Sequence, residues 1–238
     1  MSVILRSLDG DVNVLKDVIN GCGFLKNGET VTVETDQTSP FNSSLTCNAI
    51  KIKDSNNQML FELDVSTTTA TTGRFGVWYA QDAFKSDADD STGNGPAREL
   101  NQAIGCENGV IIRLRYGTTS GGTVKSISIV MMRTNLGKIA FNAEMTSKNS
   151  SGATSNGTTR TTVAFGDVAP FNTVTYDATS TRPQSEIAPI LTSADIDTLS
   201  YTLKGGWLVY HSDRSYYLRQ CIVNGKTYIT DGMYAIEV

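Results

Sequence analysis

The sequence predicts a mainly β protein, an antiparallel β-sandwich or jelly-roll-like fold with a C-terminal β-meander and few short helices. Runs rich in β-branched and aromatic residues alternate with turn signals, which is the pattern of strands in an all-β domain. The 238 residues, of which 39% are hydrophobic, suffice for the core of one large domain. We count about ten to twelve candidate strands, more than one sheet usually holds, so we expect two packed sheets.

One helix is predicted over residues 11–20. Val12, Leu15 and Ile19 recur at helical spacing, and Gly21 follows as a stop signal. This helix would bury one apolar face against the sheets.

Two further short helices are expected. Pro96 can open a helix over residues 96–104, since proline favours the first helical position, and Gly105 can end it. The hydroxyl of Ser193 can cap a short turn that follows it.

The strands of the N-terminal and middle parts are marked by β-prone runs on either side of polar turns. Ile127, Ile129 and Met131 would line the buried face of one hairpin because alternate residues of a strand share a face. The expected hairpins span residues 45–66, with a turn at 54–57, and 123–146, with a turn at 135–137; single strands are expected over 75–79 and 110–116.

Residues 205–238 read as a four-stranded meander with three successive turns. Asn224-Gly225 and Asp231-Gly232 each supply a pair that tolerates positive φ, as a two-residue type I′ turn requires. Residues 211–214 would form the first, slightly longer turn.

The chain divides by composition into three stretches. Residues 1–176 form a β-rich body that includes the short N-terminal helix. Residues 177–192 form an extended connector that contains two prolines. Residues 193–238 form the meander, which we expect to belong to the same domain as the body. Residues 86–95 and 147–159 read as long polar loops, which are often functional or mobile.

Charge and composition narrow the classes of partner. The formal net charge is -4, and the 20 basic residues form no cluster, so we expect no nucleic-acid partner. No apolar stretch approaches the roughly 18–20 residues of a membrane span, and the first residues lack the pattern of a secretory signal. We therefore expect that the protein does not insert into a membrane and that it is synthesised in a cytosol. The widely spaced Cys22, Cys47, Cys106 and Cys221 are expected to be buried thiols.

Residues that carry out chemistry are scarce, and we expect no enzyme activity and no cofactor. His211 is the single imidazole of the chain. A triad with Asp213 and either Ser212 or Ser215 would need the nucleophile and the base apart in sequence and together in space, whereas these residues share one predicted turn. A polar surface histidine is the better interpretation.

An acidic cluster offers a weak metal candidate. Asp87, Asp89 and Asp90 alternate in a way that could direct carboxylates at one hard cation such as Ca²⁺. The bidentate glutamate of a calcium-binding EF-hand loop is missing, because its place is taken by Arg98. A solvated acidic loop is the favoured interpretation, and no metal site is predicted.

Aromatic residues give the one constructive hypothesis for a ligand. Aromatic rings on a sheet face could stack on sugar rings, although aromatics also supply core area in any sandwich. The weak glycan-binding candidates are Trp78, Tyr79, Trp207, Tyr210, Tyr216 and Tyr217.

The polar segments TTTATTG (residues 67–73) and NSSGATSNGTT (residues 149–159), together with the Asn-Gly and Asp-Gly hairpins near the C-terminus, give the chain a neutral, hydroxyl-rich surface. In this composition the whole chain resembles the virion structural proteins of tailed bacteriophages. The resemblance implies a non-enzymatic tail, collar or capsid component, which assembles in the host cytoplasm and has copies of itself and other virion proteins as partners. The alternative is a carbohydrate-binding or adhesion module that uses surface aromatics.

Overall fold

The computed structural model describes residues 2–38, 46–66, 75–78, 99–116, 124–133, 139–148, 154–155, 160–161, 186–189, 205–209, 218–231 and 234–238. Within these ranges the protein has one helix and sixteen strands, arranged in three antiparallel sheets. The mainly β prediction is therefore confirmed. The expectation of two sheets is wrong, because the described strands pair into three.

The central sheet has seven strands in the order β1-β6-β7-β8-β9-β10, with β11 also paired to β9. Its strands are β1 (Ile4–Ser7), β6 (Glu99–Cys106), β7 (Gly109–Tyr116), β8 (Val124–Arg133), β9 (Ile139–Lys148), β10 (Thr154–Ser155) and β11 (Arg160–Thr161). The N-terminal sheet has the order β2-β3-β4-β5 and consists of β2 (Thr30–Thr38), β3 (Thr46–Lys53), β4 (Met59–Ser66) and β5 (Phe75–Trp78). The C-terminal sheet has the order β12-β13-β16-β15-β14 and consists of β12 (Glu186–Pro189), β13 (Gly205–Val209), β14 (Arg219–Val223), β15 (Lys226–Thr230) and β16 (Tyr234–Glu237).

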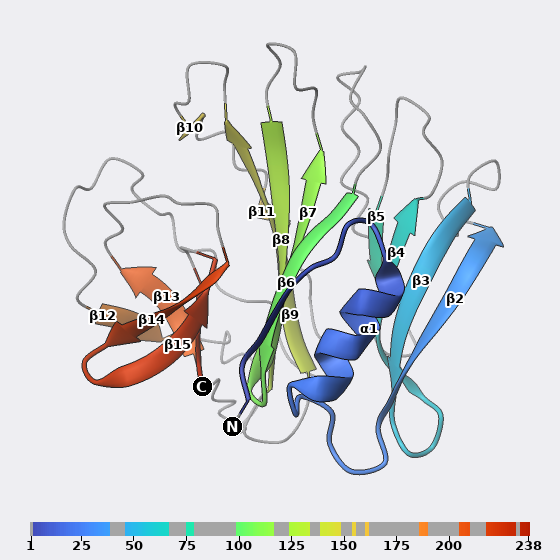
Figure 1. Ribbon diagram of the computed structural model, residues 1–238, viewed down its shortest axis with the longest axis horizontal. Helices are drawn as coiled ribbons and strands as arrows, with labels where there is room; N and C mark the ends of the chain where they lie inside the picture. The colour runs from blue at the N-terminus through green and yellow to red at the C-terminus, as the bar shows by residue number, and fades with distance from the viewer. Residues whose placement is uncertain are drawn as a thin grey trace, which may run out of the picture.

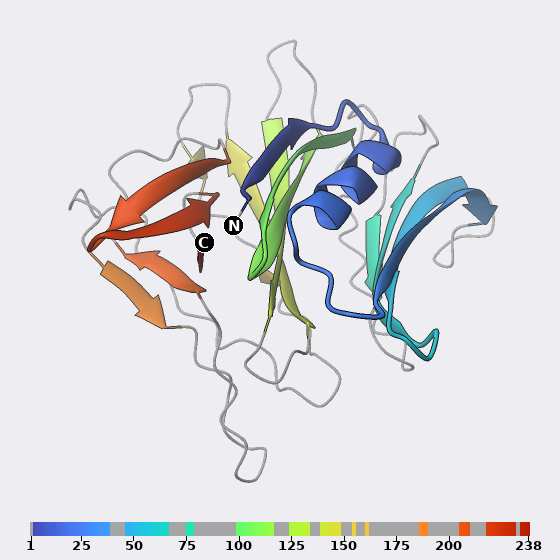
Figure 2. The ribbon, with the colours of Figure 1, turned by 60° about the horizontal axis from the view of Figure 1, so that its bottom comes forward.

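The three sheets form layers, and the seven-stranded sheet is the central layer. Helix α1 (Val12–Gly21) lies between the central and the N-terminal sheet, and the C-terminal sheet lies on the other side of the central sheet (Figures 1 and 2). One continuous hydrophobic core joins these layers and includes Leu15 of α1, Phe61 of β4, Ile111 of β7 and Ile236 of β16.

The central sheet is covered on both faces. Val110, Ile111 and Ile112 are consecutive in β7 and all fully buried, and so are the residues from Ile129 to Met132 in β8. Because neighbouring residues of a strand point to opposite faces, such runs show that apolar layers lie on both sides. The predicted burial of Ile129 and Met131 is confirmed, and the side chain of Ile127 lies outside the described ones. The opposite face of β8 is buried as well.

The predicted N-terminal helix is confirmed within one residue at each end. A carboxylate oxygen of Asp11 accepts a hydrogen bond from the Asn13 amide at 2.8 Å, which caps the first turn. Leu15 and Ile19 are buried on the face that contacts the sheets. At the helix end, Gly105 of β6 leaves room for Cys22, because a Cβ at Gly105 would lie 2.8 Å from the Cys22 Sγ atom.

The second predicted helix, over residues 96–104, is wrong from Glu99 onward, where β6 begins. This strand pairs with β1 along one edge and with β7 along the other, so its backbone groups are bonded on both sides. Ala103 and Ile104 are buried on opposite faces. Pairing and burial with distant segments outweigh the local helix signals of Pro96 and Gly105.

The predicted hairpins of the middle region are confirmed. Strands β3 and β4 pair around a turn in which Asp54 accepts hydrogen bonds from the amides of Asn56 at 2.9 Å and Gln58 at 2.8 Å. Strands β8 and β9 pair from Arg133 and Ile139 outward, and β5 and β7 are also where expected. Strands β1 and β2 were not anticipated from the pattern.

The C-terminal meander is wrong in its order. Strand β13 pairs with β16, and β14 forms the far edge, so the four strands have a Greek-key order. The Asn224-Gly225 turn is confirmed by positive φ at both residues, +50° and +77°. The predicted two-residue turn at Asp231-Gly232 is longer, since the last paired residues are Thr230 and Ala235.

Two expected segments fall only partly within the described residues. Within the predicted connector, residues 186–189 form β12 and pair with β13. Within the polar stretch 147–159, Thr154–Ser155 forms β10 beside β9. The loop 86–95 and the helical turn after Ser193 lie outside the described residues.

Candidate functional site

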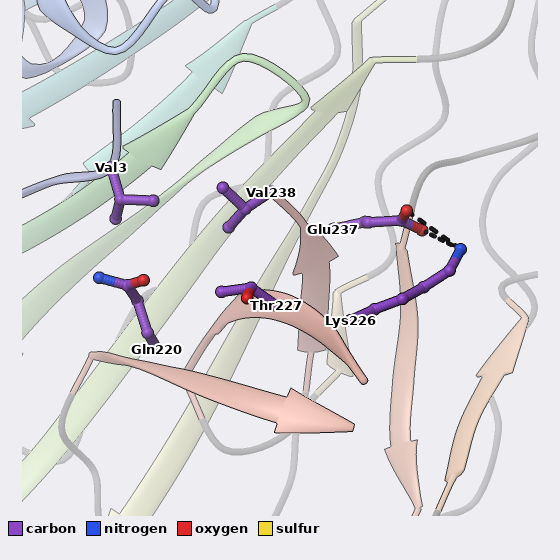
Figure 3. Close-up of a pocket in the computed structure, with 6 residues that line it drawn as sticks. All are labelled: Val3, Gln220, Lys226, Thr227, Glu237 and Val238. Carbon is purple, nitrogen blue, oxygen red and sulfur yellow. Dashed lines mark hydrogen bonds and ion pairs between the residues drawn. The ribbon is translucent and has the colours of Figure 1, made fainter. Parts of the chain in front are cut away.

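The described surface contains a groove of about 470 Å³ where the N-terminal segment of the central sheet meets the C-terminal sheet (Figure 3). The segment before β1, the hairpin of β14 and β15, and the end of β16 contribute its walls. The lining residues are Val3, Gln220, Lys226, Thr227, Glu237 and Val238.

Strand alternation and one turn place the polar residues of the groove. The Asn224-Gly225 turn sets β14 and β15 in the register that pairs Ile222 with Thr227. Gln220 therefore shares a face of the sheet with Ile222 and Thr227. The Val238 amide donates to the Thr227 carbonyl at 2.9 Å, which continues the ladder between β15 and β16 along the groove.

The hairpin of β6 and β7 fixes the end of β16. The Asn108 side-chain amide donates to the Glu237 carbonyl at 3.0 Å, and the Cys106 thiol lies 3.6 Å from the same oxygen. A Cβ at Gly109 would collide with the Met131 carbonyl oxygen of the neighbouring strand β8, and it would lie 2.7 Å from Ile236 Cδ1 of β16. The groove thus lies next to a hydrogen-bonded and closely packed junction between the central and the C-terminal sheet.

One ion pair lies at the rim of the groove. The Lys226 ammonium is 3.0 Å from Glu237 Oε1 and 3.1 Å from Oε2. The hydrogen bond to Glu237 and the attraction of its charge raise the pKa of Lys226, so the lysine stays an ammonium. With this charge pair, one amide, one hydroxyl and two valines, the lining residues can offer hydrogen bonds and apolar contact to a segment of a polypeptide.

The two exposed large hydrophobic side chains of the described part of the chain lie on the strands that flank the groove. Ile222 of β14 is 74% exposed and Leu5 of β1 is 43% exposed. Leu5 shares a face of β1 with Val3, and Ile222 shares a face of β14 with Gln220, so each belongs to the side of its strand that lines the groove. Each of the two strands is an outermost strand of its sheet.

The predicted glycan residues that the structure describes do not come together. Trp78 ends β5 in the N-terminal sheet, and Trp207 lies in β13 of the C-terminal sheet, with the central sheet between them (Figure 2). Trp207 is the register partner of Tyr234, whose ring is fully buried. Tyr79, Tyr210, Tyr216 and Tyr217 lie outside the described residues.

The other sequence candidates also lie outside the described residues. These are the acidic residues Asp87, Asp89 and Asp90, and His211 with its neighbours. Within the described ranges no three His, Cys, Asp or Glu side chains gather where they could hold a metal ion. None of the described helical residues forms a span long and apolar enough to cross a membrane.

The cysteines are free thiols, as expected. Cys22, Cys47 and Cys106 are buried, whereas Cys221 is half-buried beside the small apolar cluster of Val223, Tyr228 and Ala235. Burial raises the pKa of both Cys22 and Cys47 to about 11, and it raises the pKa of Cys106 as well. These three thiols therefore stay protonated at neutral pH and act as small apolar side chains.

Sequence reasoning did not single out the groove. The alternation of Gln220 and Ile222 with Cys221 and Val223 is visible before the Asn-Gly turn. It identifies two faces of a strand, but it does not reveal that the strand ends its sheet or that residue 3 lies opposite.

No protein-family model matches the chain, and neither the curated proteins nor the solved structures contain a significant match.

Proposed function

We propose that the chain is a non-enzymatic structural protein that works by assembling with copies of itself and with other proteins. In its most specific form the proposal is a tail, collar or capsid component of a tailed bacteriophage virion, assembled in the host cytoplasm, with a sandwich-like layered β body. The composition of the polar segments supports the virion assignment.

One structural observation supports the proposed assembly function. The exposed Ile222 and Leu5 lie on two edge strands that flank one groove, and this groove rests on a junction fixed by Asn108 and Gly109. Exposed apolar residues beside the open edge of a sheet favour contact with another polypeptide, because such a contact buries the side chains and bonds the edge.

The test is the mass of the purified protein in solution, measured by light scattering after size exclusion over a concentration series. The proposal predicts a discrete oligomer whose mass is a multiple of 25.6 kDa. A monomer at every concentration would contradict assembly with copies of itself. Binding to a panel of immobilised glycans, measured on the same sample, would then favour the carbohydrate-binding alternative.

A further inference from the structure

Strand β14 is an open edge. It is the last strand of the C-terminal sheet, and no strand pairs with its outer side in the part of the chain that the structure describes. Its Gln220 is exposed and its Ile222 is 74% exposed, so these side chains are largely uncovered by the residues that the structure describes.

The hydrogen bonds of the hairpin decide which backbone groups of β14 point outward. The Val238 amide donates to the Thr227 carbonyl, so the backbone groups of Thr227 point toward β16. Those of Tyr228 then point toward β14 and bond Cys221, its register partner. By alternation, the N–H and C=O groups of Gln220 and Ile222 point away from the sheet.

These outward groups form a self-complementary set. Gln220 and Ile222 lie one residue on either side of Cys221. An antiparallel copy of β14, related by a two-fold axis at Cys221, would pair Gln220 of each copy with Ile222 of the other. All four outward backbone groups of each strand would then be bonded, in four hydrogen bonds across the axis.

Two other edge strands, β2 and β12, have features that oppose such pairing, and β14 lacks these features. Strand β2 has a register shift between Glu34 and Gln37, with Asp36 at a φ of +54°. Strand β12 ends in Pro189, which has no N–H group. Strand β14 has an unbroken register with β15 and contains neither lysine nor proline.

We propose that β14 pairs antiparallel with β14 of a second copy of this chain, which joins two C-terminal sheets into one continuous sheet. The inference rests on the proposed assembly function and names the surface that carries it. Each Ile222 is placed on the groove side, next to Gln220 of the other copy. The groove of one copy thereby receives the exposed Ile222 of the other.

The charges of the strand agree with this pairing. Arg219 is the one charged residue of β14, and its register partner in the second copy is Val223. The two Arg219 side chains stand at opposite ends of the paired strands, about 14 Å apart along the strand direction, which exceeds a Debye length of about 8 Å at physiological salt. No like charges meet at the axis.

A strand pair of five residues is small, so neighbouring surface must add to the contact. A specific interface buries at least about 1,000 Å². The groove walls beside β14 supply the additional surface, with Val3 and the exposed Leu5 on the side of β1 that faces the groove. The occupant that fits this surface is therefore a second copy and its Ile222.

Cysteine crosslinking tests the register. The two Cys221 residues would form a non-hydrogen-bonded pair with Cα atoms about 4.5 Å apart, within the range of about 4.4–6.8 Å that a disulfide spans. Two copper(II) phenanthroline complexes, each of which takes one electron while the two thiols lose their protons and form an S–S bond, should give a covalent dimer that reductant splits. Cys221→Ser should abolish it, because Cys22, Cys47 and Cys106 are buried.

A charge introduced next to the axis tests the interface without the disulfide. Ile222→Lys should raise the dissociation constant of the dimer at least about tenfold, measured by light scattering. Gln37→Lys, the matched change on the exposed part of β2, should leave it unchanged. The circular dichroism spectrum and urea midpoint of Ile222→Lys should equal those of the wild type, since the side chain is largely exposed.

The two proposals fail in different ways. An oligomer that persists in Ile222→Lys and yields no Cys221 crosslink would overturn the β14 pairing and leave the assembly function in place. A wild-type protein that is monomeric at all concentrations would overturn both the β14 pairing and the proposed assembly with copies of itself. A crosslinked dimer whose formation is lost in Ile222→Lys would establish the pairing.

Discussion

Arg133 is a buried charge that has several partners. Its side chain is 4% exposed and donates through Nε and Nη2 to the Phe24 carbonyl at 3.2 and 3.0 Å. Nη1 lies 3.1 Å from Glu29 Oε1, Nη2 contacts Glu29 Oε2, and the guanidinium lies 4.4 Å from the centre of the Phe24 ring. The arginine thus ties the end of β8 to the segment between α1 and β2.

Arg133→Met should lower the free energy of unfolding by about 3–5 kcal/mol, because it leaves the Glu29 carboxylate, which is 10% exposed, without its cation. Urea denaturation followed by tryptophan fluorescence measures this. The double variant Arg133→Met with Glu29→Met should lose clearly less than the sum of the two single variants. Additive losses would show that the two side chains do not act as a pair.

The Cys22 thiol gives a pH dependence whose sign follows from its environment. Burial raises its pKa to about 11, from the ordinary value near 9. In the unfolded chain the thiol loses its proton near pH 9, whereas in the folded chain it keeps it up to about pH 11. The stability that this group contributes is complete below about pH 9 and is lost as the pH rises toward 11.

Between about pH 9 and 11, the unfolding free energy of the wild type should therefore fall more steeply than that of Cys22→Ala. Urea denaturation at a series of pH values measures both slopes, and the difference between them removes the contribution of other titrating groups. Equal slopes in the two proteins would contradict the assignment to Cys22.

The roles of single residues could be predicted from the sequence only in part. The buried cysteines could be predicted, because isolated cysteines without ligand spacing behave as apolar residues. The role of Arg133 could not, since its partners Phe24 and Glu29 are more than 100 positions away. The aromatic candidates were chosen by residue type, and residue type does not say which face of which sheet is open.

Two glycines are required for different structural reasons. Gly225 has a φ of +77° in the hairpin of β14 and β15, with no atom within 4 Å of a Cβ placed there. Gly109 is the first residue of β7, and a Cβ placed there would collide with the Met131 carbonyl oxygen. The first glycine is required by backbone conformation and the second by close packing.

Gly225→Ala should cost about 1 kcal/mol, the price of a left-handed conformation, and Gly225→Asn less, because asparagine tolerates that region. Gly109→Ala should cost more, about 1–3 kcal/mol, because the main chain of β8 cannot yield as a side chain does. Thermal and urea unfolding rank the three variants. A Gly109→Ala protein as stable as the wild type would contradict the close approach of the β8 main chain to Gly109.

Local signals explain which elements could be predicted. The Asp11 cap with its apolar spacing, and the turns at Asp54 and Asn224, are short-range chemistry and gave the right elements. Strand β6 carried helix signals, and its pairing with β1 and β7 overrode them. An element bonded along both edges is decided by segments that its own sequence does not contain.

Sheet order belongs to the scale of the whole molecule, and there the pattern was least informative. Strand β13 bonds β16 instead of β14, although β14 follows it in the chain. This exchange makes β14 an edge and places Ile222 beside the groove with Val3. The candidate site is therefore a consequence of non-local pairing, which hairpin signals cannot reveal.

Amide hydrogen exchange along β14 tests whether the chain assembles through this edge. The amides of Cys221 and Val223 bond to β15 and should exchange slowly at every protein concentration. Those of Gln220 and Ile222 point outward, so we expect fast exchange in dilute solution and protection as the concentration rises. Fast exchange of these two amides in a concentrated oligomeric sample would contradict assembly through β14.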